Sequence, residues 1–457
     1  MKTLTRSSGE PRLGFQLLVL ILGVLFWREP AHAQGMASLI PASEYTALLE
    51  LYNHSGGTSW NQKSGWTNST AEAWFGVQVA GGHVVSISLP SNSLNGSLPD
   101  SLGNLTGLQY FDLSGNGLSG GIPASVGALT NLIYLDLSRN QLAQGIPPGL
   151  GNLTRLQILY LYSNKLTGSL PGSLGNLVQL TTFYANNNLL SGAIPGSLGN
   201  ATQLQSLNLG KNQLSGILPG ELGNLLQLQS LIFTGNILSG PVPASLGNLT
   251  QLQTLSLSAN QLSGSIPDSF GALSSLRTVY LSGNQLSGVI PAFVGNLTQL
   301  QTLDLSTNGL TGTIPATLGN LPQLRSLTLQ YNQLVGDVPN FQTFHSVSIQ
   351  LNYNGLTVAN GSASLSNIQA MISAGNTVIY TPQFTIPSLG PVLLLPGGAV
   401  QIGISGAAGT KYRVLASTDF EAWDNLGTVT LSSSKGTFID STAHDFSSRY
   451  YRAVITP

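Results

Sequence analysis

Residues 252–267 read LQTLSLSANQLSGSIP, and the same frame of leucines, asparagine, glycine and proline recurs through most of the chain. One asparagine marks each copy, and eleven of them follow one another in steps of 24 residues: Asn92, Asn116, Asn140, Asn164, Asn188, Asn212, Asn236, Asn260, Asn284, Asn308 and Asn332. A degenerate twelfth copy ends at Asn354, 22 residues further on. Ten equal steps do not arise by chance, and a fixed period in the range of about 20–29 residues predicts a solenoid of stacked coils.

Each position of the frame has a physical role. The alternation Leu-Ser-Leu places Leu255 and Leu257 on one face of a short strand and polar residues on the other. Asn260 follows the strand, and its amide can pair with buried backbone groups of the bend and of the next coil. Gly264 permits a turn that a Cβ would hinder, and Pro267 fixes φ where the convex segment starts. Because one coil cannot bury its apolar face alone, we expect parallel strands to stack, with the eleven asparagines forming a ladder.

The frame L-x-G-x-I-P is similar to the plant-type leucine-rich repeat of receptor-kinase ectodomains and polygalacturonase-inhibiting proteins, over residues 84–356. This resemblance implies an α/β solenoid, a right-handed superhelix of about 11–12 units with a parallel β-sheet on its concave face. Residues 34–83 resemble the N-terminal cap of secreted members, with a helix near 47–52 and with Trp60, Trp66 and Trp74. Plant caps have a cysteine pair where this chain has residues such as Glu72 and Val79. A secreted bacterial member therefore fits better.

The composition excludes several classes of function. The 457 residues include 16 Lys and Arg, 17 Asp and Glu and no Cys. A near-neutral balance argues against a nucleic-acid partner, which needs a basic surface. Without cysteine there is no disulfide, no thiolate metal site and no cysteine nucleophile.

The N-terminus has the order of a secretory signal. Lys2, Arg6 and Arg12 precede an apolar run over residues 13–27, which is followed by Ala31-His-Ala33. This order predicts a signal peptide over residues 1–33. The run is shorter than the roughly 20 residues that a membrane span needs. We therefore expect an exported, soluble product without a membrane span.

Two further units follow the repeats. Residues 357–387 are expected to form a capping helix and an extended linker, with Leu365, Ile368, Met371 and Ile372 at helical spacing. Six strand-like runs between turn residues predict a small C-terminal β-sandwich over residues 388–457. This part resembles fibronectin-type-III modules of secreted bacterial proteins, and Trp423 is expected in its core.

The sequence offers little catalytic chemistry. It has none of the G-x-S-x-G, H-E-x-x-H or phosphate-loop motifs, and its histidines are scattered, so we expect no enzyme, no metal site and no cofactor. One pair of carboxylates, Asp112 and Asp136, falls at the same outward strand position in adjacent coils, about 4.8 Å apart. Retaining glycosidases use a similar spacing of about 5–5.5 Å. We expect the pair to lie on an open, wet surface that does not raise either pKa, which argues against catalysis.

Binding is the better hypothesis. The outward positions six, four and two residues before each ladder asparagine hold a cluster of aromatic and acidic residues, with Arg139 at its edge: Tyr110, Asp112, Tyr134, Asp136, Tyr160, Tyr162 and Tyr184. Tyrosine provides a large contact area at low entropy cost and is enriched in binding hot spots. This tyrosine patch is the candidate ligand site for an extracellular protein or peptide. The structural alternative is that aromatic residues merely suit exposed strands.

Two other functions stay open. One is a structural or adhesive protein of the cell wall that binds glycan. The other concerns the later coils, where the first outward position holds only hydroxyl residues: Ser206, Ser230, Thr254, Thr278, Thr302 and Ser326. Such a column could order water or bind ice, but a curved sheet fits a flat crystal plane poorly.

Overall fold

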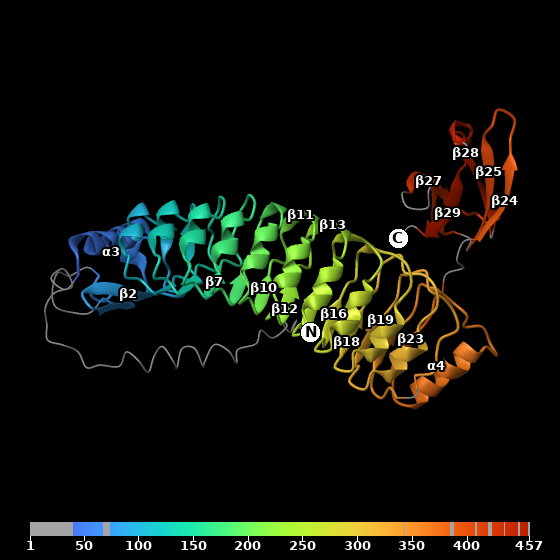
Figure 1. Ribbon diagram of the computed structural model, residues 1–457, viewed down its shortest axis with the longest axis horizontal. Helices are drawn as coiled ribbons and strands as arrows, with labels where there is room; N and C mark the ends of the chain where they lie inside the picture. Colours follow the sequence, from blue (N-terminus) through green and yellow to red (C-terminus); the bar gives the residue numbers. More distant parts are fainter. Residues whose placement is uncertain are drawn as a thin grey trace.

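The computed structural model describes residues 40–66, 74–341, 343–383, 388–406, 409–418, 423–433, 435–446 and 448–455. The predicted signal peptide and Glu72 lie outside these residues, so both stay predictions. Figure 1 shows the coils side by side along a bent rod, with the C-terminal strands beyond its end. In the described part of the chain, no helix has the length and apolar character needed to cross a membrane.

One 14-stranded sheet runs the length of the rod. Its first two strands pair antiparallel and all later neighbours pair parallel. In order they are β1 (Val77–Ala80), β2 (His83–Ser88), β4 (Tyr110–Asp112), β6 (Tyr134–Asp136), β7 (Ile158–Tyr160), β8 (Thr182–Tyr184), β10 (Ser206–Asn208), β12 (Ser230–Ile232), β14 (Thr254–Ser256), β16 (Thr278–Tyr280), β18 (Thr302–Asp304), β19 (Ser326–Thr328), β21 (Ser348–Gln350) and β23 (Thr377–Ile379). The predicted solenoid with its parallel sheet is confirmed.

Short 3-10 helices form the opposite side of the coils, each after the proline of the frame. They are η2 (Asp100–Asn104), η3 (Ala124–Ala128), η4 (Pro148–Asn152), η5 (Gly172–Asn176), η6 (Gly196–Asn200), η7 (Gly220–Asn224), η8 (Ala244–Asn248), η9 (Asp268–Ala272), η10 (Ala292–Asn296) and η11 (Ala316–Asn320). Pro267 precedes η9 with φ −64°, as predicted for the start of this segment. Gly264 has φ +75°, which confirms that its turn requires glycine.

A second sheet, which the sequence analysis did not anticipate, follows the ladder asparagines. Its parallel strands are β9 (Ser191–Ala193), β11 (Gln213–Ile217), β13 (Ile237–Pro241), β15 (Gln261–Gly264) and β17 (Gln285–Leu286). Two shorter parallel pairs continue the same arrangement at either end: β3 (Asn95–Ser97) with β5 (Gly117–Ser119), and β20 (Val335–Gly336) with β22 (Gly355–Leu356).

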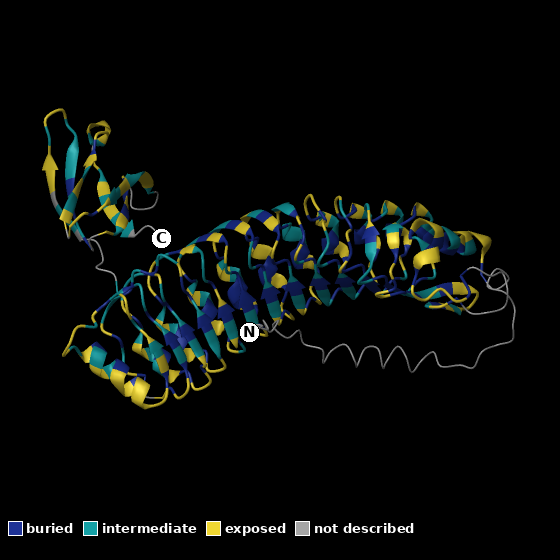
Figure 2. Cartoon of the chain, turned by 180° about the vertical axis from the view of Figure 1, so that it is seen from behind, coloured by how far each residue is buried: buried dark blue, intermediate teal, exposed yellow. Residues whose placement is uncertain are grey.

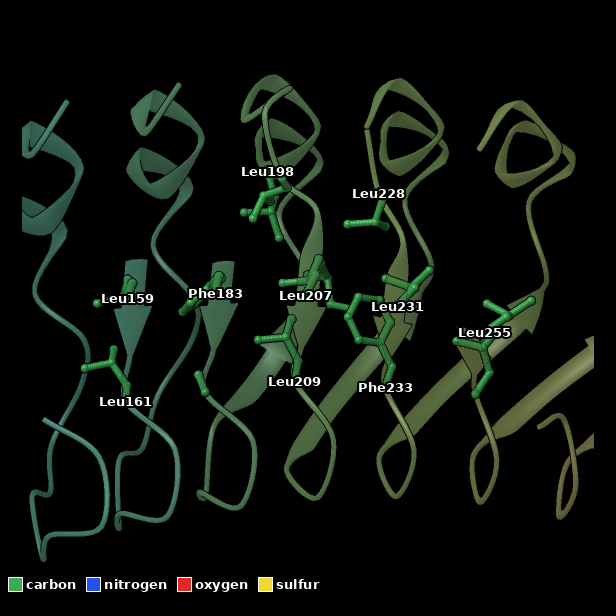
Figure 3. Packing of buried hydrophobic residues seen from close by; sticks show 14 of the residues in the cluster. Leu159, Leu161, Phe183, Leu198, Leu207, Leu209, Leu228, Leu231, Phe233 and Leu255 are labelled. Carbon is green, nitrogen blue, oxygen red and sulfur yellow. The ribbon is translucent and has the colours of Figure 1, made fainter. Parts of the chain in front are cut away.

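The leucines of successive coils form one continuous core. Leu255 and Leu257 are both fully buried, and their equivalents line the space between the strands and the 3-10 helices (Figure 3). Figure 2 shows buried residues through the whole length of the rod and exposed residues on its loops. Stability therefore comes from contacts between neighbouring coils.

The asparagine ladder is present, but it points the other way from our expectation. Asn140 Nδ2 donates to the carbonyls of Leu113 (3.0 Å) and Leu137 (3.1 Å), and its Oδ1 accepts from Leu118 N (3.0 Å). Leu113 and Leu118 belong to the preceding coil, not the next one. The prediction of the partner coil was wrong because the amide projects back under the strand that it follows.

Both ends of the solenoid are closed by side chains. At the N-terminal end, helix α3 (Ala42–His54) and 3-10 helix η1 (Gly57–Ser59) pack beside Trp60, Trp66 and Trp74, which are all buried. The buried Glu44 of α3 accepts from Val84 N at 2.7 Å and contacts His83 Nδ1 at 2.6 Å. This carboxylate joins the cap to the first long strand.

The C-terminal end differs in part from the prediction. Ser362 caps the start of helix α4 (Ala363–Ser373), and its hydroxyl accepts from Leu365 N at 3.2 Å. Ile368 and Met371 are buried as expected, but Ile372 is 45% exposed, since it lies on the outer side of the helix. β23 lies between the helix and the linker expected over residues 381–387, of which 384–387 lie outside the described residues. Gln383 Nε2 donates to Leu351 O at 3.1 Å. This glutamine ends the ladder where the next asparagine would stand.

The C-terminal module contains two three-stranded antiparallel sheets. One has the order β24 (Ser388–Leu394), β25 (Val400–Ser405), β28 (Lys435–Asp440), and the other β27 (Asp424–Thr430), β26 (Lys411–Ser417), β29 (Tyr450–Ile455). A short 3-10 helix, η12 (Ala443–Asp445), precedes β29. All six strands overlap runs predicted from the sequence, although β27 shares only its last two residues with the run expected over 429–431. Trp423 is only half-buried and lies 4.1 Å beneath the Arg452 guanidinium, so its predicted place in the core was wrong.

Candidate functional site

Parallel pairing brings the predicted residues of the tyrosine patch together. Tyr110 and Tyr134 are direct partners across β4 and β6, and so are Asp112 and Asp136. The same row continues from Asp136 to Tyr160 of β7 and from there to Tyr184 of β8. Four adjacent coils thus present their outward residues in register, which the 24-residue period predicted.

The tyrosine rings contact one another. Tyr110 and Tyr134 are stacked, with centroids 4.4 Å apart and planes 8° from parallel. Tyr160 meets Tyr134 edge to face at 6.0 Å, and contacts Tyr184 at 5.3 Å and Tyr162 at 5.9 Å. Aromatic pairs at such distances contribute about 0.5–1.5 kcal/mol each beyond their burial. The patch is therefore an ordered aromatic surface, and none of its rings is isolated.

The two carboxylates do not lie on a wet surface, so that expectation was wrong. Asp112 and Asp136 are each only 6% exposed, because the tyrosines of the same strands cover them. Each Oδ1 accepts from the backbone N–H two residues on, at 2.9 Å from Ser114 and 2.8 Å from Ser138. The Oδ2 atoms have only long contacts with the hydroxyls of Tyr110 (3.4 Å) and Tyr134 (3.3 Å).

Burial changes the protonation chemistry of the patch. It raises the pKa of Asp136 to about 6; the Ser138 hydroxyl and N–H beside the carboxylate oppose this shift, and the charge of Asp112 adds to it. Burial and the neighbouring carboxylates also raise the pKa of Tyr110 and Tyr134 well above the usual range. Both hydroxyls therefore stay protonated and act as donors.

One edge of the patch is formed by Arg139, Tyr162 and Ser138. The Arg139 guanidinium lies 5.6 Å from the Tyr162 ring centroid, and its backbone has φ +55°. Ser138 is fully buried, and its Oγ has no hydrogen-bond partner of acceptable geometry. A buried hydroxyl without a partner is unfavourable by about 1–3 kcal/mol unless a ligand or water pairs with it.

The later coils present a different surface. The first strand position from β8 to β23 holds only hydroxyl residues, aligned from strand to strand: Thr182, Ser206, Ser230, Thr254, Thr278, Thr302, Ser326, Ser348 and Thr377. Neighbouring columns also bond among themselves, as Thr234 Oγ1 with Ser256 Oγ at 2.6 Å and Ser258 Oγ with Ser282 Oγ at 2.9 Å. We call these columns the hydroxyl rows.

Sequence reasoning missed a second aromatic pair. Tyr331 and Tyr353 stack with centroids 4.3 Å apart and planes 8° from parallel, and Tyr331 is 43% exposed. Both have positive φ and directly precede a ladder asparagine. The shared position before Asn332 and Asn354 was the signal that could have identified the pair.

The comparisons with known proteins agree with this architecture. A family model described as a leucine-rich repeat region matches residues 87–213 and 210–393. The chain belongs to this family of leucine-rich repeat proteins. No curated protein matches it in sequence.

Several solved structures are similar. The ectodomain of the Arabidopsis thaliana receptor kinase GASSHO1/SCHENGEN3, in complex with Casparian strip integrity factor 2, is 34% identical with a TM-score of 0.62, covering 68% of this chain and 40% of that one. The Arabidopsis receptor kinase HAESA, with the peptide hormone IDA and the co-receptor SERK1, is 36% identical with a TM-score of 0.61, covering 69% and 54%. A plant ice-binding protein is 27% identical with a TM-score of 0.52, covering 67% and 92%.

This chain spans about half the length of the two receptor ectodomains. The similar receptors are extracellular ectodomains with peptide ligands, which makes protein or peptide binding the general expectation for the fold. The plant-type repeat, the bacterial origin, the domain boundaries and the fibronectin-type-III likeness stay predictions.

Proposed function

We propose that the protein is exported and, without catalysing a reaction, captures a protein or peptide ligand on its tyrosine patch. The observation that supports this is the contrast along one sheet: five tyrosines and two buried carboxylates occupy four adjacent coils, whereas the same columns further on hold mainly small hydroxyl residues. The complexes of the similar receptor ectodomains with peptides support the same class of ligand.

The patch has the chemistry of a binding hot spot. Its rings are held by their neighbours, so little side-chain entropy is left to lose when a ligand docks. Tyr160, Tyr162 and Tyr184 are half-buried and keep part of their surface for contact. The Tyr184 hydroxyl already pairs with Ser206 Oγ at 2.8 Å, which fixes its orientation.

The test uses a random peptide library displayed on phage. Binders are selected on the wild-type protein and then measured against the triple variant Tyr134→Ala, Tyr160→Ala, Tyr184→Ala. The matched control replaces Tyr280, Tyr331 and Tyr353 by alanine, which are tyrosines outside the patch. We expect the first triple variant to lose at least about 100-fold in affinity, since hot-spot truncations remove 2 kcal/mol or more each.

Circular dichroism and thermal unfolding of both triple variants control for folding, because Tyr134 is almost fully buried. If the folded patch variant keeps its affinity, or if the control variant loses as much, the patch is not the site.

Glycan binding is the second candidate, and the Tyr331–Tyr353 stack favours it, because sugars dock on exposed aromatic faces. Retention of the protein on insoluble polysaccharide, lost on Tyr331→Ala, would support it. Passage through the matrix without delay would exclude it.

The hydroxyl rows give only weak support for ice binding. The rod is bent, and several hydroxyls already bond one another. The similarity to a plant ice-binding protein therefore supports a common fold, but it gives no evidence for a matching ice-binding surface.

A further inference from the structure

We propose that the tyrosine patch selects a ligand with a cationic side chain, the guanidinium of Arg or the ammonium of Lys, which docks over the Asp112–Asp136 pair. This inference rests on the proposed function and names the chemistry of its ligand. It follows from the charge of the pair, from the tyrosines of the same and the neighbouring strands and from a buried hydroxyl beside Asp136 that lacks a well-formed hydrogen bond.

The first argument is that the two carboxylates lie side by side, and within the described part of the chain no ion pair joins either of them to a cation. They are direct partners on adjacent parallel strands, which lie about 4.8 Å apart. Among the described residues, the ion pairs between side chains join other groups, such as Glu44 with His83 and Asp440 with Arg449. Like charges at this distance repel, and burial removes the water that would weaken the repulsion. A cation from a ligand would neutralise both.

The second argument is that the local turn does not require the charge. Asn208 occupies the same strand position in β10, and its Oδ1 accepts from Gly210 N at 3.0 Å. This is the hydrogen bond that Asp112 and Asp136 make with Ser114 and Ser138. A neutral amide thus makes the same hydrogen bond, so the turn does not require the negative charge at the two Asp positions.

The third argument is the surrounding set of acceptors. Tyr110 and Tyr134 lie on the same strands as the pair, Tyr160 is the strand neighbour of Asp136, and a cation within about 6 Å of such a ring gains 0.5–2 kcal/mol. The buried Ser138 Oγ lies beside the Asp136 carboxylate but forms no hydrogen bond of acceptable geometry within the described residues, so it can still pair with a ligand. A guanidinium has five N–H donors, enough to reach both carboxylates and a hydroxyl.

The occupant is an organic cation. Within the described chain, no group of three His, Cys, Asp or Glu side chains could hold a metal ion. Only 6% of each Asp is exposed, so a slender cation at the end of a long side chain suits the pair better than a bulky one.

The experiment compares two small probes on the full protein at pH 7.5 and low salt. N-acetyl-arginine amide is cationic, and N-acetyl-citrulline amide has nearly the same shape without the charge. Binding is measured by calorimetry or by NMR shifts. We expect the arginine probe to bind at least about tenfold more tightly than citrulline, a difference of about 1.4 kcal/mol.

The variants make the test specific. Asp112→Asn with Asp136→Asn keeps the hydrogen bonds of the turn, as Asn208 does, and should reduce the preference to less than about twofold. Asp304→Asn is the matched control, because Asp304 has the same strand position and accepts from Ser306 N at 3.0 Å. It should retain the full preference.

Equal binding of the two probes, no saturable binding of either, or the same loss in the Asp304 control would overturn the inference. The proposed function is separable from it. If library-selected peptides depend on the tyrosines but show no preference for Arg or Lys, the cation site fails and peptide capture stands.

Discussion

The two halves of the long sheet share one interior and differ on their outward face. From β4 to β8 the surface has tyrosines over two buried carboxylates, whereas from β10 to β21 it has hydroxyl rows. Behind both, the same leucines and ladder asparagines repeat every 24 residues. The comparison teaches that the interior of each coil determines the fold and leaves the outward columns free to vary.

The halves also differ in electrostatic strain. In the hydroxyl half, hydroxyls pair with uncharged partners, as in the contact of Thr234 with Ser256, although the buried Gln330 Oε1 has no partner within the described residues. In the tyrosine half, two carboxylates are buried side by side, and burial raises the pKa of Asp136 to about 6. Unfavourable groups retained on an otherwise regular scaffold are typical of functional sites. The strain therefore favours the tyrosine half as the site.

The largest expected effect is common to both halves. Asn140→Ala and Asn260→Ala should each destabilise the fold by about 3 kcal/mol or more, since each leaves several buried backbone groups without partners. Urea unfolding followed by circular dichroism measures the loss. The control Asn152→Ala removes an exposed asparagine of η4 and should change stability by less than about 0.5 kcal/mol. A small effect at either ladder position would show that the two halves do not share one scaffold.

A smaller effect should separate the halves. Because the folded pKa of Asp136 is about 6 and its ordinary value is 3.8, the native state takes up the proton first as the pH falls. The resulting stabilisation is fully present below pH 3.8 and is lost as the pH rises through 6. Asp136→Asn lacks this dependence, so it should exceed wild type at pH 7.5 by up to about 3 kcal/mol and equal it near pH 3.8.

Thermal unfolding of both proteins between pH 3.8 and 7.5 measures this difference. Subtracting the wild-type stability from that of the variant at each pH removes the contribution of the other titrating groups. Asp304→Asn, in the hydroxyl half, should differ from wild type by less than about 0.5 kcal/mol throughout. A pH-independent difference for Asp136→Asn would contradict the raised pKa. Binding of the arginine probe should have the opposite dependence and weaken below pH 6, since protonation removes a charge that attracts it.

The fold was predictable because it depends on residues that repeat. The 24-residue period determined the strand register, the 3-10 segments and the members of the ladder, and alternation determined which side of each strand faces outward. These are local, periodic properties of the chain. The hydrogen-bond partners of the ladder amides could not be predicted in this way, because the direction of a side chain such as that of Asn140 depends on how coils stack.

The site was predictable in its members and not in its environment. The period brought Tyr110, Tyr134 and the two Asp residues into one cluster, as the structure has them. It could not show that the rings stack over the carboxylates, since rotamers and burial follow from side-chain packing between coils. For this reason the wet surface expected at Asp112 and Asp136 was wrong. Gln383, which replaces an asparagine outside the period, was missed for the same reason.

The smallest expected effect concerns the hydroxyl rows. Thr234→Val removes one partner of the Ser256 hydroxyl, which is mostly buried, and should destabilise by about 1 kcal/mol. The double variant with Ser256→Ala also removes the Ser256 hydroxyl itself. It should recover most of the lost stability, because no buried polar group is then left unpaired. Neither variant should alter binding of selected peptides or of the arginine probe, which are measured alongside urea unfolding. If the double variant lost peptide binding while keeping its stability, the hydroxyl half would belong to the site, and the contrast between the two halves would no longer identify the tyrosine patch.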